Sequence, residues 1–312
     1  MAETALSTSA LRKEFGSVTA VEALDLTIAR GDIFGLVGPD AAGKTTTFRM
    51  LCGILPPTSG SATVLGVDVL RRPESVKPRI GYMSQRFSLY GDLTVLENLA
   101  FFADIYHVPR RERAARREEL LGFSRLGPFQ QRLAQDLSGG MKQKLALACT
   151  LMHTPELLFL DEPTTGVDPV SRRDFWRILY QLSHQGVTLI VSTPYMDEAE
   201  RCTCVGLMHR GRLIQTDTPE GLKRRMTGDL LELICTPQRG CRELLLEMPG
   251  VKSVQAFGER LHVWLENADR DQPLVEEAMI HGNIVTEHLR RIPPTLEDVF
   301  VSVIENQPEG AA

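Results

Sequence analysis

Short apolar runs mark the first two-thirds of this 312-residue chain, among them Ile33–Val37, Leu157–Leu160 and Val187–Val191. Apart from Thr188, the last two are apolar instead of alternating with polar residues, which is typical of strands buried on both faces of a parallel sheet. The first leads through a glycine-rich segment into a helical pattern at Lys44–Leu55. This order of strand, loop, helix and further buried strands predicts an α/β core.

The segments around these runs extend the predicted architecture. Leu6–Ala29 predicts two strands joined by a turn, and Ser61–Val69 predicts a further strand. The stretch from Ser88 to Met152 is mostly helical in pattern and predicts a helical subdomain. Within it, Val108-Pro109 predicts a helix start, because proline suits a first turn. The charged run Arg110–Glu119 that follows predicts a solvated helix face.

The pattern changes after Arg225. From there the elements follow a βαββαβ order, which is typical of a small α+β ferredoxin-like domain. They are a strand at Leu230–Cys235, a helix at Arg239–Met248, a hairpin of Val251–Phe257 with Leu261–Glu266, a helix at Asp271–His281, a strand at Ile284–Arg291 and a closing helix at Thr295–Ile304. We therefore expect two domains, residues 1–225 and residues 226–312.

The composition excludes several classes of protein but does not indicate a function. Hydrophobic residues make up 43% and charged residues 24%, an ordinary globular balance. No stretch approaches the roughly 20 apolar residues of a membrane-spanning helix, and the N-terminus does not resemble a signal peptide. The formal charge of -5 argues against a nucleic-acid partner. The six cysteines follow no structural-zinc spacing, which indicates a reduced compartment and no metal site of their own.

The strongest chemical signal is the segment Gly38–Thr46, which fits the Gly-x4-Gly-Lys-Ser/Thr phosphate loop. Gly43 allows a close backbone approach, so that successive N–H groups face phosphate oxygens at the start of a helix. Lys44 is expected to pair with the β- and γ-phosphates, and the hydroxyl of Thr45 to ligate Mg²⁺.

Two carboxylates, Asp161 and Glu162, end the apolar run at Leu157–Leu160. Such a pair is costly beside an apolar strand unless a cation or proton compensates it. In a nucleotide site the first would support Mg²⁺, and the second would act as the general base for the attacking water. The alternative, two surface acids that open a loop, fits the preceding apolar strand poorly.

A third segment, Ser138-Gly139-Gly140, precedes a pattern of apolar residues at helical spacing. It predicts a helix N-terminus, whose free N–H groups can bind an anion such as a γ-phosphate.

Together these motifs resemble the ATP-binding cassette (ABC) family over the first two-thirds of the chain. The resemblance implies an ATPase core with an antiparallel β subdomain and a helical subdomain, and a head-to-tail dimer that encloses two ATP molecules. In that dimer Ser138, Gly139 and Gly140 would cap the partner's ATP, and Asp168 would communicate between the two sites.

The resemblance also implies the remaining nucleotide contacts. Phe15 would stack on adenine, although packing at a strand end is an alternative for this residue. Gln85 would touch Mg²⁺ and link the nucleotide to the helical subdomain. The expected ATP-binding residues are Phe15, Gly38, Pro39, Asp40, Ala41, Ala42, Gly43, Lys44, Thr45, Thr46 and Gln85. The expected Mg²⁺ residues are Thr45, Gln85 and Asp161.

Three positions depart from the family pattern. Asp40 and Ala41 replace the usual asparagine and glycine, which places a carboxylate near the phosphates and narrows backbone freedom. Pro194 replaces the histidine of the switch segment, and proline can neither donate a hydrogen bond nor carry a proton. These changes predict slow turnover at the chain's own site, and an asymmetric heterodimer would accommodate that.

The chain resembles most the ATPase subunits of ABC-2 drug-efflux exporters, in particular the first cassette of tandem-cassette efflux ATPases. The tail Pro294–Phe300 resembles that of drug-resistance export ATPases. This implies separately encoded membrane permease subunits, a second ATPase chain of the same or another kind, and a location on the cytoplasmic face of the inner membrane. Two alternatives stay open: a regulatory cassette that hydrolyses ATP poorly, and a soluble ABC ATPase without a role in transport.

Overall fold

The computed structural model describes residues 3–85 and 89–305. Ser88, the expected first residue of the helical subdomain, and residues 306–312 of the expected C-terminal domain lie outside the described residues. The chain forms two compact units, Met1–Pro219 and Glu220–Ala312. The boundary that we expected at Arg225 stays a prediction.

The first unit contains two sheets. The antiparallel sheet has the order β2-β1-β4-β5, and the larger sheet has the order β10-β9-β3-β8-β7-β6, in which β9, β3, β8, β7 and β6 are parallel. The strands are β1 (Thr4–Phe15), β2 (Val18–Ala29), β3 (Ile33–Val37), β4 (Ser59–Val64), β5 (Val67–Asp68), β6 (Ile80–Met83), β7 (Leu157–Asp161), β8 (Thr188–Thr193), β9 (Cys204–His209) and β10 (Arg212–Asp217).

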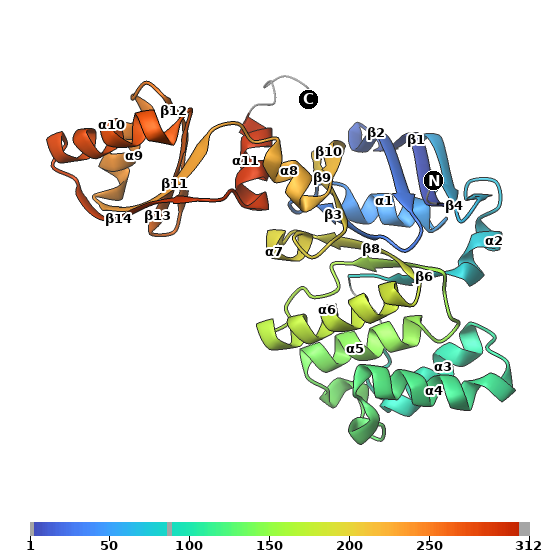
Figure 1. Ribbon diagram of the computed structural model, residues 1–312. Coiled ribbons are helices and arrows are strands. Elements are labelled where there is room, and N and C mark those ends of the chain that lie inside the picture. The colour runs from blue at the N-terminus through green and yellow to red at the C-terminus, as the bar shows by residue number, and fades with distance from the viewer. Residues whose placement is uncertain (1–2, 86–88, 306–312) are drawn as a thin grey trace. The chain divides into compact units, whose positions relative to one another are not determined.

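Helices surround the larger sheet. Figure 1 shows α3, α4 and α5 gathered at one end of this unit, away from β1, β2 and β4. The helices are α1 (Lys44–Leu51), α2 (Pro73–Val76), α3 (Val95–Ile105), α4 (Arg110–Ser124), α5 (Gly139–Thr150), α6 (Pro169–His184) and α7 (Met196–Ala199), with 3-10 turns η1 (Lys77–Arg79), η2 (Gly127–Phe129) and η3 (Ala134–Asp136). Helix α8 (Pro219–Arg224) begins where the first unit ends.

The core of the first unit joins its two sheets through α1. Phe48 of this helix packs edge-on against Phe159 of β7, with ring centroids 5.5 Å apart. The same cluster includes Leu6 and Leu24 from the antiparallel sheet. All four side chains are fully buried, so the phosphate loop that precedes α1 rests on a packed and rigid base.

The second unit has the order β12-β13-β11-β14, with all strand pairs antiparallel. Two helices, α9 and α10, cover one face of this sheet (Figure 1). The elements are β11 (Asp229–Thr236), α9 (Gln238–Leu246), β12 (Val251–Phe257), β13 (Arg260–Leu265), α10 (Ala268–His281), β14 (Val285–Ile292) and α11 (Leu296–Glu305). The predicted fold class, an α/β ATPase core with a small ferredoxin-like domain, is confirmed.

Two element predictions were wrong in detail. The helix expected at Lys44–Leu55 ends at Leu51, because Gly53 adopts a left-handed φ of 66° and its N–H turns back to the carbonyl of Met50. The single strand expected at Ser61–Val69 is a hairpin of β4 and β5. Its two-residue turn, Leu65-Gly66, has positive φ at both residues, which suits a tight hairpin.

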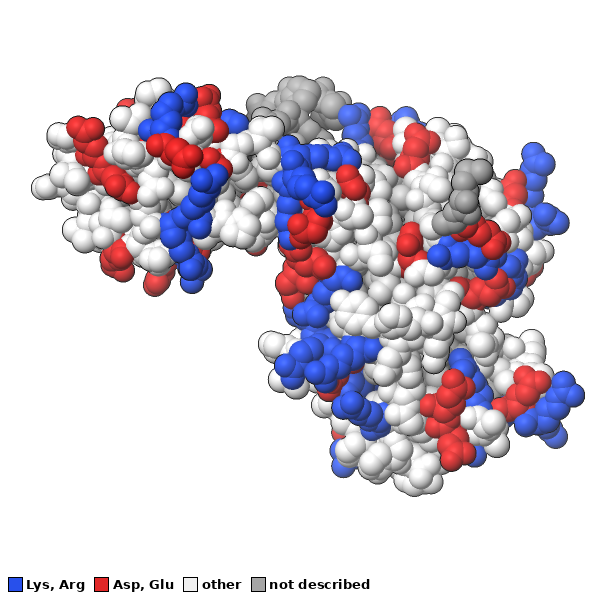
Figure 2. Space-filling view, in the orientation of Figure 1, with Lys and Arg blue, Asp and Glu red and all other residues white. Residues whose placement is uncertain are grey.

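Charged side chains of both signs are interspersed over the face of the molecule in Figure 2. Among the described residues, every helix is too short or too polar to span a bilayer. The expectation that nucleic acid is not a partner stays a prediction.

Candidate functional site

The phosphate loop lies between β3 and α1, and two glycines give it its shape. A Cβ on Gly38 would lie 2.0 Å from the carbonyl oxygen of Met208. A Cβ on Gly43 would lie 2.4 Å from the carbonyl oxygen of Ala20, and Gly43 has a φ of 105°. The loop therefore packs so closely against its neighbours that only glycine fits at these two positions.

The side chain of Lys44 turns back into the loop. Its ammonium group donates hydrogen bonds to the carbonyls of Gly38 (2.8 Å) and Pro39 (2.9 Å), and it lies 3.3 Å from Oε1 of Glu162. Lys44 is 4% exposed, so these three oxygens compensate a buried positive charge. The loop thus holds a cation where the phosphates of a nucleotide would enter.

Asp161 ends β7 with its carboxylate fully buried. Its Oδ1 accepts hydrogen bonds from the hydroxyls of Ser192 (2.6 Å) and Thr45 (3.2 Å), and its Oδ2 accepts one from Tyr82 at 3.4 Å. Burial, with the carboxylate of Asp161 nearby, raises the pKa of Tyr82 to about 12. Tyr82 therefore stays a neutral hydrogen-bond donor at physiological pH.

The pair Thr45 and Asp161 fits a magnesium ion. Both offer hard oxygen atoms, and Mg²⁺ usually binds through one or two protein oxygens together with water and substrate phosphates. Among residues 3–85 and 89–305, no group of three or more His, Cys, Asp or Glu side chains is arranged as a metal cage. A Mg²⁺ ion at this place would thus depend on the nucleotide for several of its ligands.

Glu162 follows Asp161 and adopts a left-handed φ of 48°, a conformation that costs a non-glycine residue about 1 kcal/mol. Its Oε2 accepts hydrogen bonds from Nε2 of Gln85 (2.9 Å) and from the hydroxyl of Thr165 (3.3 Å). Its N–H is bonded to the hydroxyl of Ser192 at 3.0 Å. The structure thus brings the predicted residues Gln85 and Glu162 together, and it adds Thr165 and Ser192, which sequence reasoning missed.

Lys44, Thr45, Gln85 and Glu162 open onto one pocket of about 600 Å³. Phe15, at the end of β1, is 50% exposed there, and the ammonium of Lys13 lies 5.1 Å from its ring centroid. An exposed aromatic ring at this rim is suited to stack on a base. The pocket is lined by Phe15, Val18, Thr19, Ala20, Asp40, Ala41, Ala42, Gly43, Lys44, Thr45, Thr46, Gln85, Glu162, Arg210 and Gly211.

The Ser-Gly-Gly segment lies outside this lining and begins α5. The hydroxyl of Ser138 caps the helix and accepts the N–H of Met141 at 3.4 Å. A Cβ on Gly140 would lie 2.5 Å from the side chain of Ser171, in the first turn of α6. Asp168 caps α6, and its bond from the N–H of Ser171 lowers the pKa of its carboxyl. Two capped helix N-termini, those of α5 and α6, therefore lie close together.

The segment after Gln85 is bonded to the segment before Ser138. Backbone hydrogen bonds join the carbonyls of Gly91 and Leu93 to the N–H groups of residues 135 and 134 (3.0 and 2.9 Å). Two more run from the N–H groups of residues 95 and 96 to residues 132 and 130. We call this set the subdomain ladder. Asn98, fully buried, supports it by bonding Tyr90 on both backbone groups.

Pro194 follows β8, at the place where the family has a histidine. The preceding residue, Thr193, accepts the N–H of Gly38 on its carbonyl at 3.3 Å, so this strand end touches the phosphate loop. The Thr193 hydroxyl donates to the carboxylate of Glu198 at 2.7 Å. Glu198 is fully buried and also accepts the hydroxyl of Thr164, two residues after Glu162. Glu198 therefore connects the strand end before Pro194 to the loop that follows Glu162.

Comparisons with known proteins agree with this geometry. Residues 21–165 match the family model described as ABC transporter, and residues 218–304 match the model for the C-terminal domain of DrrA1-3-like ATP-binding proteins. A solved structure described as the ATP binding subunit of an ABC transporter superimposes with a TM-score of 0.64 and 27% identity, covering 71% of this chain and 93% of that chain.

Two curated relatives are similar over most of the chain. The probable multidrug ABC transporter ATP-binding protein YbhF of Escherichia coli K12 is 43% identical over 310 residues, which cover 97% of this chain and 53% of YbhF. The chain thus spans about half the length of that relative. The daunorubicin resistance ATP-binding protein DrrA3 of Streptomyces coeruleorubidus is 35% identical over 306 residues, which cover 96% of each protein. This chain belongs to the family of ABC transporter ATP-binding proteins.

Proposed function

We propose that the chain binds and hydrolyses ATP to drive a membrane exporter. The observation that carries this proposal is the convergence of Lys44, Thr45, Glu162 and Gln85 on one pocket, with Asp161 bonded to Thr45 beneath it, although they come from three distant parts of the sequence. Family membership supports it. The relatives named for daunorubicin and multidrug resistance support export of small organic molecules, which the membrane subunit would select.

In the proposed reaction, the ammonium group of Lys44 leaves the carboxylate of Glu162 and pairs with the β- and γ-phosphates of ATP. Glu162 then faces the attacking water, held by Gln85 and Thr165. The water oxygen bonds to the γ-phosphorus, the bond to the β–γ bridging oxygen breaks, and Glu162 takes the proton. A magnesium ion held near Thr45 would neutralise charge on the phosphates. ADP, phosphate and a proton leave.

The paired helix N-termini support a head-to-tail dimer. Ser138, Gly139 and Gly140 are placed at a helix start outside the chain's own pocket, where free N–H groups would meet the γ-phosphate of a partner chain. Asp168 caps the neighbouring helix and would communicate between the two nucleotide sites of the dimer. The second chain is a copy of this one or a different cassette.

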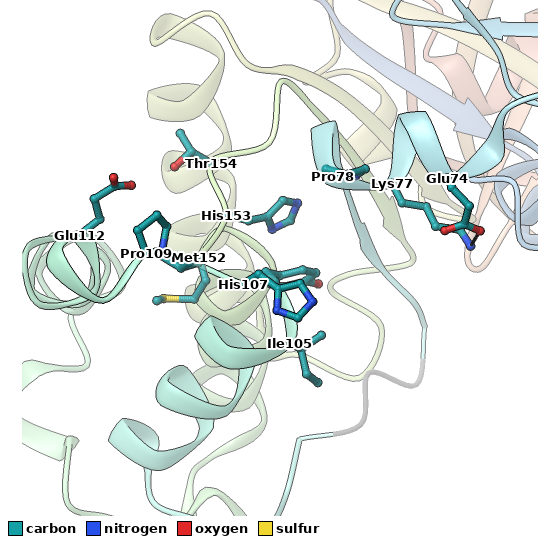
Figure 3. A pocket seen from close by; sticks show the side chains of 12 residues that line it. Glu74, Lys77, Pro78, Ile105, His107, Pro109, Glu112, Met152, His153 and Thr154 are labelled. Carbon is teal, nitrogen blue, oxygen red and sulfur yellow. Dashed lines mark hydrogen bonds and ion pairs between the residues drawn. The ribbon is translucent and has the colours of Figure 1, made fainter.

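A second pocket supports docking of a membrane subunit. It measures about 510 Å³, and Figure 3 shows side chains from the α2–η1 turn, the end of α3 and the start of α4 around it. Ile105 is 49% exposed there, and Tyr90, which is 45% exposed, has its ring centroid 4.5 Å from that of Phe101 on α3. We infer that a helical segment of a separately encoded permease binds these exposed apolar side chains, and that the chain works at the cytoplasmic face of the cell membrane.

ATP hydrolysis by the purified chain tests the proposal, beside Lys44→Ala and Glu162→Gln. Turnover in the wild type that both substitutions abolish supports a working ATPase. If wild-type turnover survives both substitutions, the assigned roles are wrong. For the permease, Ile105→Glu is expected to reduce co-purification with the membrane subunit while ATP affinity stays unchanged. Equal co-purification would contradict the docking site.

One observation favours a second candidate function, a regulatory cassette that binds ATP but hydrolyses it slowly. Pro194 offers no side-chain donor toward a γ-phosphate, so the switch contact of the family is missing. In that case the chain would bind ATP tightly and show negligible turnover alone, and turnover would appear only with a partner cassette. Pro194→His distinguishes the two candidates, because it is expected to raise turnover only if the switch contact limits the rate.

A further inference from the structure

The hairpin of β9 and β10 carries a cation at the nucleotide pocket that no motif predicts. Its two turn residues are Arg210 and Gly211, and both line the pocket that holds Phe15 and Lys44. Both have positive φ, 46° and 80°, as the tightest hairpin turn requires. Asparagine, aspartate and glycine suit the first position of such a turn, whereas arginine does not. A residue that local backbone preference disfavours suggests a function.

The turn is fixed against the phosphate loop. The N–H of Gly211 donates to the carbonyl of Ala42 at 2.9 Å, and the carbonyl of Gly211 accepts the N–H of Glu22 at 2.8 Å. A Cβ on Gly43 would lie 3.5 Å from the Cα of Gly211, which shows how closely the two loops approach. The backbone of Arg210 is therefore held beside the segment that binds phosphates.

The charge of Arg210 is uncompensated. Within the described part of the chain no carboxylate lies within ion-pair distance of its guanidinium, and the residue is exposed. Arg212, two residues on, is instead paired with Glu22 at 2.8 Å. The phosphate loop itself carries Asp40, which adds negative charge where a polyphosphate would bind. A second cation opposite Lys44 would offset that charge.

We propose that Arg210 is a further nucleotide-binding residue, whose guanidinium contacts the phosphates of bound ATP or ADP from the β9–β10 turn. The planar guanidinium forms paired, charge-assisted hydrogen bonds to phosphate oxygens. The hydrogen bond to Ala42 holds this turn against the phosphate loop, which favours the phosphates over the base. This inference rests on the proposed function, since it concerns the same pocket.

The test is equilibrium binding of ATP, ADP and adenosine to the full chain, measured by calorimetry and by competition with a fluorescent ADP analogue. Arg210→Asn places a favoured residue in the turn, so folding stability is expected to stay equal or rise. ATP and ADP affinity is nevertheless expected to fall about 5- to 10-fold, with less effect at high salt. Adenosine affinity is expected to stay unchanged.

Two matched variants separate charge from structure. Arg210→Lys keeps the charge on an equally disfavoured turn residue and is expected to retain most of the ATP affinity. Arg212→Gln removes a neighbouring charge that is already paired and is expected to leave ATP affinity unchanged. Equal ATP affinity for Arg210→Asn and wild type, or an equal loss for adenosine, overturns the inference. If the wild-type chain does not bind ATP, the proposed function fails as well.

Discussion

Removing the side chain of Glu198 is expected to lower the free energy of unfolding of the first unit strongly. It is fully buried, accepts the hydroxyls of Thr193 and Thr164, and lies 3.5 Å from Nε of Arg172. In Glu198→Ala these two hydroxyls lose a charged acceptor, and each such hydrogen bond contributes about 1.5–3 kcal/mol. Arg172 is partly exposed and adds little.

The expected loss of free energy of unfolding is therefore about 3–5 kcal/mol, the range for breaking a buried charged cluster by removing one partner. Glu198→Gln keeps one acceptor oxygen but points an NH₂ group at a hydroxyl. The Thr193 hydroxyl already accepts the N–H of Tyr195 at 3.0 Å, so it has little freedom to reverse. For this variant we expect a loss of about 1–2 kcal/mol.

Urea unfolding followed by tryptophan fluorescence measures this in the full chain. The sequence has two tryptophans, Trp176 in the first unit and Trp264 in the second. In a Trp264→Phe background the signal comes from Trp176 alone, so the transition of the first unit is read separately. Asp197→Ala is the control, because this exposed residue contacts the same Arg172 at 3.8 Å, and its removal is expected to cost under about 0.5 kcal/mol.

A loss under about 1 kcal/mol for Glu198→Ala would refute the reasoning, because two buried hydroxyls could not then have lost their acceptor. Equal losses for the alanine and glutamine variants would also refute it, since hydrogen-bonding geometry would not matter.

Three further predictions concern other parts of the first unit. Ala41 has a φ of 60°, so Ala41→Gly is expected to relieve about 1 kcal/mol of strain and to leave the urea midpoint equal or higher; a clear loss of stability would contradict this. Gly140→Ala meets Ser171 and is expected to cost about 1–3 kcal/mol in urea unfolding. A Cβ on Gly139 would meet nothing closer than 3.9 Å, so Gly139→Ala is expected to cost clearly less, and equal costs would speak against the packing described. A hydrogen bond from Arg79 is the main cause that lowers the pKa of Glu156 from 4.5 to about 2. Because the folded-state pKa is depressed, this stabilisation is present above pH 4.5 and is lost as pH falls toward 2. Urea midpoints between pH 6 and pH 3, as test values, are expected to fall less in Arg79→Gln than in wild type; equal slopes would exclude this pair as a contributor.

Much of the fold follows from sequence because buried parallel strands read as unbroken apolar runs. Residues 157–160 and the centre of β8, residues 189–191, show this, and the phosphate loop and the two carboxylates are local motifs. The hairpin of β9 and β10 was missed, since β10 is only partly buried and mixes polar with apolar residues. The ends of α1 and β4 were misplaced because single glycines with positive φ decide where they stop.

The supporting residues of the site were harder to predict. Tyr82 and Ser192 reach Asp161 from the two strands beside β7, and spacing along the chain does not reveal this neighbourhood. Arg210 reaches the pocket only because a turn packs on the phosphate loop. Such contacts depend on sheet order, and sheet order is a property of the folded chain.

The subdomain ladder has a topological consequence. Its hydrogen bonds join residues 91–96 directly to residues 130–135. The chain between them, which contains α4 and the turn at Gly127, forms a closed loop whose two ends are fixed to each other. An inserted segment or a proteolytic cut near Gly127 would therefore leave the pairing of residues 91–96 with residues 130–135 unchanged. A one-residue deletion within residues 130–135 would instead shift the pairing and rotate Ser138 away from its helix cap. Changes of chain length are therefore expected to be tolerated at the Gly127 turn and not within residues 130–135.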